Sequence, residues 1–149
     1  MILYTIGFTK KSAKEFFDLL NDNHIKRLID IRLNNASQLA GFTKGNDLSY
    51  FMDEICKAEY IHDIQLAPTK EILDNYKSKE ISWEKYEQLF IELLNQRKTY
   101  ERLSKIYNND FDKSCLLCSE LTADKCHRRL VAEFIQRNCS DTEIEIVHL

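Results

Sequence analysis

The sequence predicts an α/β fold: a single Rossmann-like domain of three layers, in which helices flank a mostly parallel sheet. Short β-branched and aromatic runs alternate along the chain with longer segments whose apolar residues recur at helical spacing. Such alternation is typical of right-handed strand–helix–strand units built around a parallel sheet. The chain has 149 residues, the usual size of one domain, so residues 1–149 are expected to form a single domain.

The first part of the chain contains two predicted strands joined by a helix. Residues 2–6 (ILYTI) form the first strand. Ser12 and Glu15 have the spacing of a capping box, which starts a helix whose apolar stripe is Phe16, Phe17, Leu19 and Leu20. Residues 25–31 (IKRLIDI) form the second strand, and the polar segment 33–45 is predicted to be a long loop of functional interest.

The same periodicities predict the remaining elements. In order, they are a helix around Leu48, Phe51, Met52 and Ile55, a strand at 60–66, a short helix at 69–76, a long amphipathic helix at 83–103, a strand at 114–118, a helix carrying Leu130, Val131, Phe134 and Ile135, and a strand at 143–149. In a parallel sheet, ligands bind beyond the carboxyl ends of the strands. That rule gathers residues 7–9, Asp30, Arg32, the turn after Leu66, Cys118 and Glu120 at one edge.

Residues 116–135 (LLCSELTADKCHRRLVAEFI) are the stretch best suited to chemistry. A strand delivers Cys118 and Glu120 to a loop, and the first turn of the following helix supplies Cys126, His127 and Arg128. Cys118 is a candidate nucleophile, because the positive end of that helix favours a thiolate. The competing interpretation is a buried cysteine that acts as a small hydrophobic residue, and this suits Cys115 better.

The other candidates also have two interpretations. His127 is either a general acid or base or a packed residue that donates to a carbonyl. Asp30 and Arg32 lie on one strand face, where they either pair with each other or leave Arg32 to bind an anion together with Arg128. Glu120 suits acid–base chemistry and an ion pair equally well. The spacing from Cys118 to Cys126 and His127 lacks the short paired pattern of structural zinc sites, so we expect no metal.

Composition narrows the function classes. A formal net charge of -3 gives no overall attraction to nucleic acid, and the basic residues Lys10, Lys11, Lys44, Arg97 and Lys98 are scattered, although nucleic acid is not excluded. No apolar run is long enough for a membrane span, and the start of the sequence has no signal-peptide pattern. The five cysteines are therefore expected to be reduced thiols in the cytoplasm. Asp124 stands where a phosphatase loop needs arginine, and no glycine-rich phosphate loop is present.

Four segments resemble one known family over essentially the whole chain. They are TIGFTKKSAKEF, LIDIR, YIHDIQLAP and LLCSELTADKCHRRLVAEFI, and their order and spacing are similar to those of the family called domain of unknown function 488. The family typically reads TIGHS, DVR, YxHLPxLGG and LLCxExxxxxCHRxxVAE. The resemblance implies an α/β fold and a site made of Thr5, Gly7, Asp30, Arg32, His62, Cys118, Glu120, Cys126, His127 and Arg128. It implies no activity, because the family has none firmly assigned.

This chain departs from the family pattern in ways that suggest a divergent branch with a different substrate. Phe8 replaces the family histidine, residues 33–38 replace a segment with proline and arginine, and Leu66-Ala67-Pro68 replaces the LGG turn. We expect a Cys/His/Glu/Arg site that binds or processes an anionic small molecule or nucleotide. Cys118, Glu120 and His127 would be catalytic, and the other residues of the site would bind the ligand. The alternative is a non-catalytic binding or regulatory module, and the sequence names neither a cofactor nor an oligomeric state.

Overall fold

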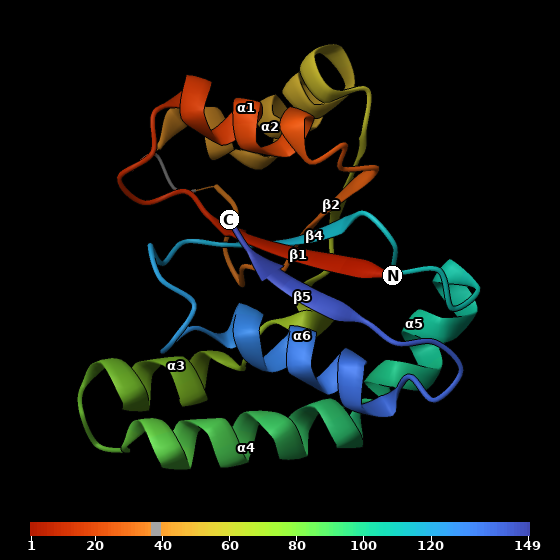
Figure 1. The fold of residues 1–149 in the computed structure, drawn as a ribbon. Helices are drawn as coiled ribbons and strands as arrows, with labels where there is room; N and C mark the ends of the chain where they lie inside the picture. Colours follow the sequence, from red (N-terminus) through yellow and green to blue (C-terminus); the bar gives the residue numbers. More distant parts are fainter. Residues whose placement is uncertain (37–39) are drawn as a thin grey trace.

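A five-stranded sheet lies between two layers of helices in the computed structural model, which describes residues 1–36 and 40–149 (Figure 1). The strands are β1 (Ile2–Gly7), β2 (Arg27–Asp30), β3 (Glu59–His62), β4 (Ser114–Cys118) and β5 (Glu145–His148). Their order across the sheet is β3-β2-β4-β1-β5, and each neighbouring pair is parallel. The predicted fold class is therefore confirmed.

The helices divide between the two faces of the sheet. One layer holds α1 (Ala13–Asp22) and α2 (Gly45–Phe51), which continues as a π-helical turn at Met52–Cys56. The other holds α3 (Lys70–Lys77), α4 (Trp83–Gln96), α5 (Thr99–Tyr107) and α6 (His127–Asn138) (Figure 1). Successive side chains of a strand point to opposite faces of the sheet, so the protein has a core on each face. Cys115 and Leu117 of β4 pack with α1 and α2, while Leu116 packs with α4 and α6.

The capping box at the start of α1 is confirmed. The Ser12 hydroxyl accepts the Glu15 amide at 3.1 Å, and the Glu15 carboxylate accepts the Ser12 amide at 2.7 Å. These bonds satisfy two amides that a helix start leaves without partners. The helix then buries Phe16, Phe17 and Leu20 against the sheet, as its apolar stripe predicts.

The prediction of a single long helix at 83–103 is wrong. The chain forms α4 and α5 instead, and Lys98 between them has a left-handed backbone with φ 48°. The Arg97 guanidinium, just before the break, donates to the carbonyl oxygens of Gln65 and Ala67 at 2.6 and 2.7 Å. Both helices pack into the same core, with Phe90 and Leu94 of α4 and Leu103 and Tyr107 of α5 among its buried residues.

Several predicted elements have bounds that differ from those observed, among them two strands and one loop. The strand predicted at 25–31 is limited to β2, and the one predicted at 60–66 ends at His62, because Ile64–Leu66 is a 3-10 turn capped by the Asp63 carboxylate. The predicted loop at 33–45 contains a 3-10 turn at Gly41–Thr43 and ends where α2 begins. Residues 37–39 of that loop lie outside the described part of the chain.

The topology brings the carboxyl ends of β1, β2 and β4 to one edge of the sheet. Gly7 is paired with Cys118, and Asp30 is paired with Leu117, so these strands end almost level with one another. The loop after β4 leads from this edge into α6, whose first residue is His127. No helix in the described residues is long and apolar enough to cross a membrane.

Candidate functional site

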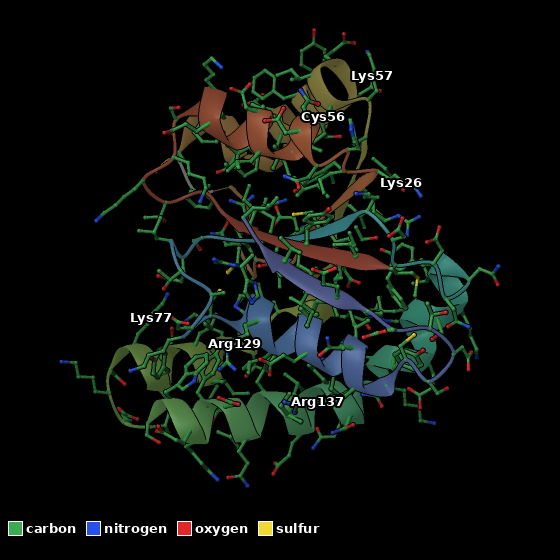
Figure 2. The ribbon with its side chains drawn as sticks, viewed as in Figure 1. Lys26, Cys56, Lys57, Lys77, Arg129 and Arg137 are labelled. Carbon is green, nitrogen blue, oxygen red and sulfur yellow. The ribbon has the colours of Figure 1, made fainter. Side chains whose placement is uncertain are left out.

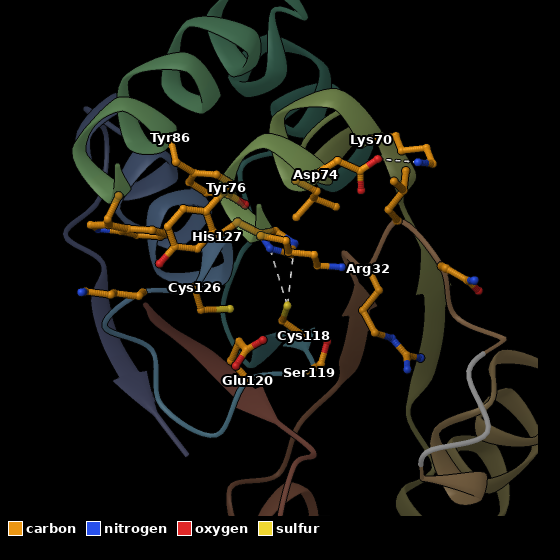
Figure 3. Close-up of a pocket in the computed structure, with 16 residues that line it drawn as sticks. Arg32, Lys70, Asp74, Tyr76, Tyr86, Cys118, Ser119, Glu120, Cys126 and His127 are labelled. Atoms are coloured by element: carbon orange, nitrogen blue, oxygen red, sulfur yellow. Dashed lines mark hydrogen bonds and ion pairs between the residues drawn. The ribbon is translucent and has the colours of Figure 1, made fainter. Parts of the chain in front are cut away.

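A cavity of about 520 Å³ opens at this edge of the sheet, where the loop after β4 meets α3, α4 and α6 (Figure 3). Five of the residues predicted from sequence line it: Arg32, Cys118, Glu120, Cys126 and His127. The other lining residues are Leu33, Asn34, Lys70, Leu73, Asp74, Tyr76, Lys77, Trp83, Tyr86, Ser119 and Lys125.

Cys118 is the last residue of β4 and lines the cavity, with its sulfur directed toward His127 (Figure 3). The side chain is 4% exposed, and burial alone would raise the pKa of its thiol. The pKa is nevertheless lowered, chiefly by a hydrogen bond from the Cys126 thiol. The backbone amides of Ser119 and Glu120 and the positive charge of Arg128 add to this effect. Cys118 is thus a buried thiol whose surroundings favour the thiolate.

Cys126 is the N-cap residue of α6, and its thiol makes no capping hydrogen bond to the helix. Its pKa is raised, chiefly by the hydrogen bond to Cys118 and further by burial. The two shifts have one main cause, because the hydrogen bond from Cys126 stabilises a thiolate on Cys118. These two sulfurs and a ring nitrogen of His127 lie within 4.8 Å of one another, which is close enough to hold a metal ion.

The His127 ring packs against Cys118. The Cys118 sulfur is 3.6 Å from Nδ1 and 3.8 Å from Nε2, so it is almost equidistant from the two ring nitrogens. A hydrogen bond in the ring plane would bring the sulfur close to one nitrogen and leave the other distant, so the sulfur lies over the ring face. The Ile31 carbonyl oxygen is 2.8 Å from Nε2 and accepts a hydrogen bond from it, which leaves Nδ1 as the nitrogen with a free lone pair.

Arg128 is 1% exposed and does not line the cavity. Its guanidinium donates to the carbonyl oxygens of Glu120 at 2.6 Å and Leu121 at 3.2 Å, and to the Cys126 sulfur at 3.6 Å. Gly7 allows this arrangement, because a Cβ atom there would lie 1.7 Å from the Glu120 carbonyl oxygen. Gly7 and Arg128 therefore position the loop after β4, and the Glu120 side chain extends from that loop into the cavity.

Arg32 lines the cavity, but its guanidinium has partners within the protein. Nε and Nη2 donate to the two Asp30 carboxylate oxygens at 2.8 and 2.6 Å, and Nη2 also donates to the Thr43 carbonyl oxygen at 2.6 Å. Tyr60 donates its hydroxyl proton to Asp30 at 2.7 Å, and the His62 ring donates from Nε2 to the Arg32 carbonyl oxygen at 2.8 Å. The structural pairing of Asp30 with Arg32 is therefore the one observed.

Several predicted site residues lie outside the cavity lining. Thr5 is buried and bonds through its hydroxyl to His148 Nδ1 at 2.7 Å. Four further residues do not line the cavity but contact residues or loops that do: Gly7, Asp30, His62 and Arg128. The Arg32 guanidinium is paired with Asp30, and Arg128 donates to the Glu120 and Leu121 carbonyl oxygens. Arg128 Nε is buried and has no hydrogen-bond partner among the described residues, and it does not line the cavity beside Arg32.

Sequence reasoning missed the aromatic and lysine residues of the cavity. Tyr76, Trp83 and Tyr86 form a cluster in which the Trp83 and Tyr86 rings stack with centroids 4.9 Å apart. Lys77 and Lys125 line the same cavity, and Lys70 lines it while paired with Asp74. The available signal was the aromatic pair at the start of α4, directly after the Ser82 cap, but its helical spacing equally suits a core.

Comparison with curated proteins and with solved structures found no match. The family model described as Domain of unknown function DUF488 matches residues 12–135, a range that includes β2, β3, β4 and the Cys118, Cys126 and His127 cluster. The resemblance noted from the sequence is thereby confirmed. The chain belongs to the DUF488 family.

Proposed function

We propose that this protein is a thiol-dependent enzyme that takes a small anionic molecule into the cavity and attacks it with the Cys118 sulfur. The observation that carries the proposal is the position of an almost fully buried thiol in the cavity lining, next to Cys126 and His127, where its surroundings lower its pKa. A thiolate is the nucleophilic form of cysteine, and perturbed pKa values concentrate at functional sites.

The neighbouring side chains suit distinct roles in such a reaction. Glu120 lines the cavity and is exposed, so its carboxylate is available to transfer a proton to or from a bound molecule. The His127 ring packs against Cys118. Its Nε2 is bonded to the Ile31 carbonyl oxygen, so Nδ1 is the nitrogen suited to transfer a proton. Lys77 and Lys125 are suited to hold negative charge at the cavity.

The other cysteines provide an internal comparison for the reactivity of Cys118. Burial raises the pKa of the Cys56 thiol to about 11, and Cys56 lies in the helical layer of α1 and α2, away from Lys77 and Arg129 on the opposite layer (Figure 2). Burial also raises the pKa of Cys115, which packs on the α1 and α2 side of the sheet. Neither thiol has the donors that surround Cys118.

The test is the order in which the five thiols react. Sub-stoichiometric iodoacetamide near pH 6.5, followed by peptide mapping with fragmentation, is expected to label Cys118 first. Cys118→Ser should remove this early label, and the matched variant Cys115→Ser should keep it. Labelling of Cys56 or Cys139 ahead of Cys118 would mean that surface access alone sets reactivity, and a non-catalytic binding module would then be the better description.

A further inference from the structure

We infer that Cys118 and Cys126 act as a dithiol pair, and that the substrate attacked by Cys118 is a small disulfide carrying negative charge. This inference rests on the proposed function and names its substrate class. Both sulfurs belong to the cavity lining, and they come from different elements, the end of β4 and the N-cap of α6. Cys115 packs on the opposite face of the sheet, so it takes no part in the pair.

The geometry favours closure of a bond between the two sulfurs. They lie within 4.8 Å of each other, and a disulfide needs a separation of about 2.05 Å, which side-chain rotation must provide. The Cys126 thiol makes no capping bond to the helix, and its contact with Arg128 Nη1 is long, at 3.6 Å, so few interactions oppose such a rotation. The Cys126 backbone is extended, outside the helix. The Cys118 side is fixed at the end of a central strand, so Cys126 is the thiol that moves.

A second thiol at this position restricts what the first can usefully attack. If Cys118 took up an alkyl or acyl group, release would require attack on carbon, and a neighbouring thiol could not discharge the adduct by attack on the Cys118 sulfur. If Cys118 is bonded to another sulfur, Cys126 can attack that bond directly. The arrangement therefore points to disulfide substrates in preference to carbon electrophiles.

The reaction balances without any further oxidant. The Cys118 thiolate attacks one sulfur of the substrate, the substrate S–S bond breaks, and the leaving half departs as a thiolate that takes up a proton. The Cys126 thiol loses its proton and attacks the Cys118 sulfur, which releases the second half of the substrate as a thiol and closes the Cys118–Cys126 disulfide. The substrate disulfide is reduced to two thiols while the dithiol is oxidised, and a small dithiol such as dithiothreitol restores the starting state.

Charge at the cavity selects the substrate. Lys77 and Lys125 line it without an ion-pair partner anywhere in the described part of the chain, whereas Lys70 is neutralised by Asp74. The Glu120 carboxylate offsets only one of these two lysine charges. Lys125 directly precedes Cys126 in the sequence and is exposed, so its charge lies close to the reacting sulfurs. A volume of about 520 Å³ accommodates a small disulfide whose carboxylates face these lysines.

The first experiment tests the pair itself with 3,3′-dithiodipropionate, a disulfide with two carboxylates. The reduced protein should form a disulfide that joins the tryptic peptides 114–125 and 126–128. Cys126→Ser should stop at the mixed disulfide on Cys118, and Cys118→Ser should form neither product. Cys115→Ser, the matched control, should behave like the native chain. A stable mixed disulfide on Cys118 in the native chain would overturn the inference.

The second experiment tests charge selection with cystamine, a disulfide of similar size with two positive charges. Each rate is divided by the rate of the same reagent with free cysteine. The normalised rate with the dicarboxylate should exceed that with cystamine by about tenfold or more, since a charged site raises association rates by that order. The Lys77→Gln, Lys125→Gln double variant should lose the preference, and exposed Lys105→Gln should keep it. Equal normalised rates would refute the anionic substrate class.

The two proposals fail in different ways. If Cys118 is alkylated first but no Cys118–Cys126 disulfide forms, the thiol nucleophile stands and the dithiol reaction is excluded. If Cys118 does not react ahead of the other thiols, the proposed function itself is excluded, and any disulfide that forms slowly is incidental.

Discussion

Arg128 donates from Nη1 to the carbonyl oxygen of Glu120 at 2.6 Å, and this contact ties the first turn of α6 to the loop that follows β4. The two residues are eight positions apart in the chain. Both lie so close to Gly7 on the neighbouring strand that a Cβ atom at that position would collide with them. The backbone amide of Glu120 is one of the donors that lower the Cys118 pKa. Arg128 does not line the cavity, but it holds the loop whose Glu120 amide donates to the Cys118 sulfur.

Gly7→Ala should destabilise the protein. The added Cβ would lie 1.7 Å from the Glu120 carbonyl oxygen and 2.8 Å from Arg128 Nη1, so backbone and a buried guanidinium would both have to move. Overpacking of this kind costs about 1–3 kcal/mol, which urea denaturation can measure. The control is Gly41→Ala, where nothing lies within 4 Å of the new Cβ. Equal stability of the two variants would show that the loop yields freely.

Asp30→Asn should be strongly destabilising, because it leaves the buried Arg32 guanidinium without its counter-charge. Removing one partner of a buried ion pair costs about 3–5 kcal/mol. Asp18→Asn breaks an exposed ion pair with Lys14 and should change stability little, since solvent screens such pairs. Both free energies come from the same denaturation experiment, and a loss for Asp30→Asn no larger than for Asp18→Asn would contradict the structural role.

Phosphate should raise the melting temperature of the native chain, because a ligand that binds only the folded state stabilises it. Most of this shift should disappear in the Lys77→Gln, Lys125→Gln double variant, whose altered residues line the cavity. Differential scanning fluorimetry gives the shift, and exposed Lys105→Gln serves as the control. A shift that survives the double variant but is lost in Arg128→Met would instead support the anion site at Arg32 and Arg128 that the sequence predicts.

The protein should fold and remain stable without a metal, although three donor atoms converge at the cavity. A metal bound by Cys118 would not meet the in-plane lone pair of Nδ1, because the Cys118 sulfur lies over the ring face and the Ile31 carbonyl holds the ring in place. Elemental analysis of protein purified under reducing conditions should find far less than one zinc or iron per chain. Near-stoichiometric metal that is lost in Cys126→Ser would overturn this prediction.

Stability should fall as the pH drops from 7.5 to 5.5, in part because of His148. Its pKa is lowered by partial desolvation and by the nearby Arg128 charge, so as the pH falls the unfolded chain binds a proton before the folded chain does. The contribution of His148 to stability is therefore fully present above the ordinary histidine pKa of about 6.5. It is lost as the pH falls toward the pKa of His148 in the folded chain. Melting curves of His148→Gln should show a flatter pH dependence than those of the native chain, and equal slopes would contradict this role of His148.

The sequence by itself determined the elements whose signals are local. The Ser12 and Glu15 capping box, the alternation along β4 and the helical stripe of α6 all depend on residues a few positions apart. Parallel topology then brought Cys118, Cys126 and His127 to one edge of the sheet, as the strand-end rule predicts. The break at Lys98 escaped detection, because apolar spacing reports which face is buried and not whether the backbone continues.

Tertiary structure decided what each polar side chain does. The His127 ring donates to the Ile31 carbonyl oxygen, 96 residues away in the chain. Arg32 donates to the Asp30 carboxylate and Arg128 to the Glu120 carbonyl oxygen, and no local sequence pattern reveals these contacts. The aromatic cluster of Tyr76, Trp83 and Tyr86 likewise depends on how α3 packs on α4. The physical reason is common to these cases: a hydrogen bond or a ring contact depends on distances of a few ångströms that only the packed chain sets, whereas periodicity fixes only which face of an element is buried.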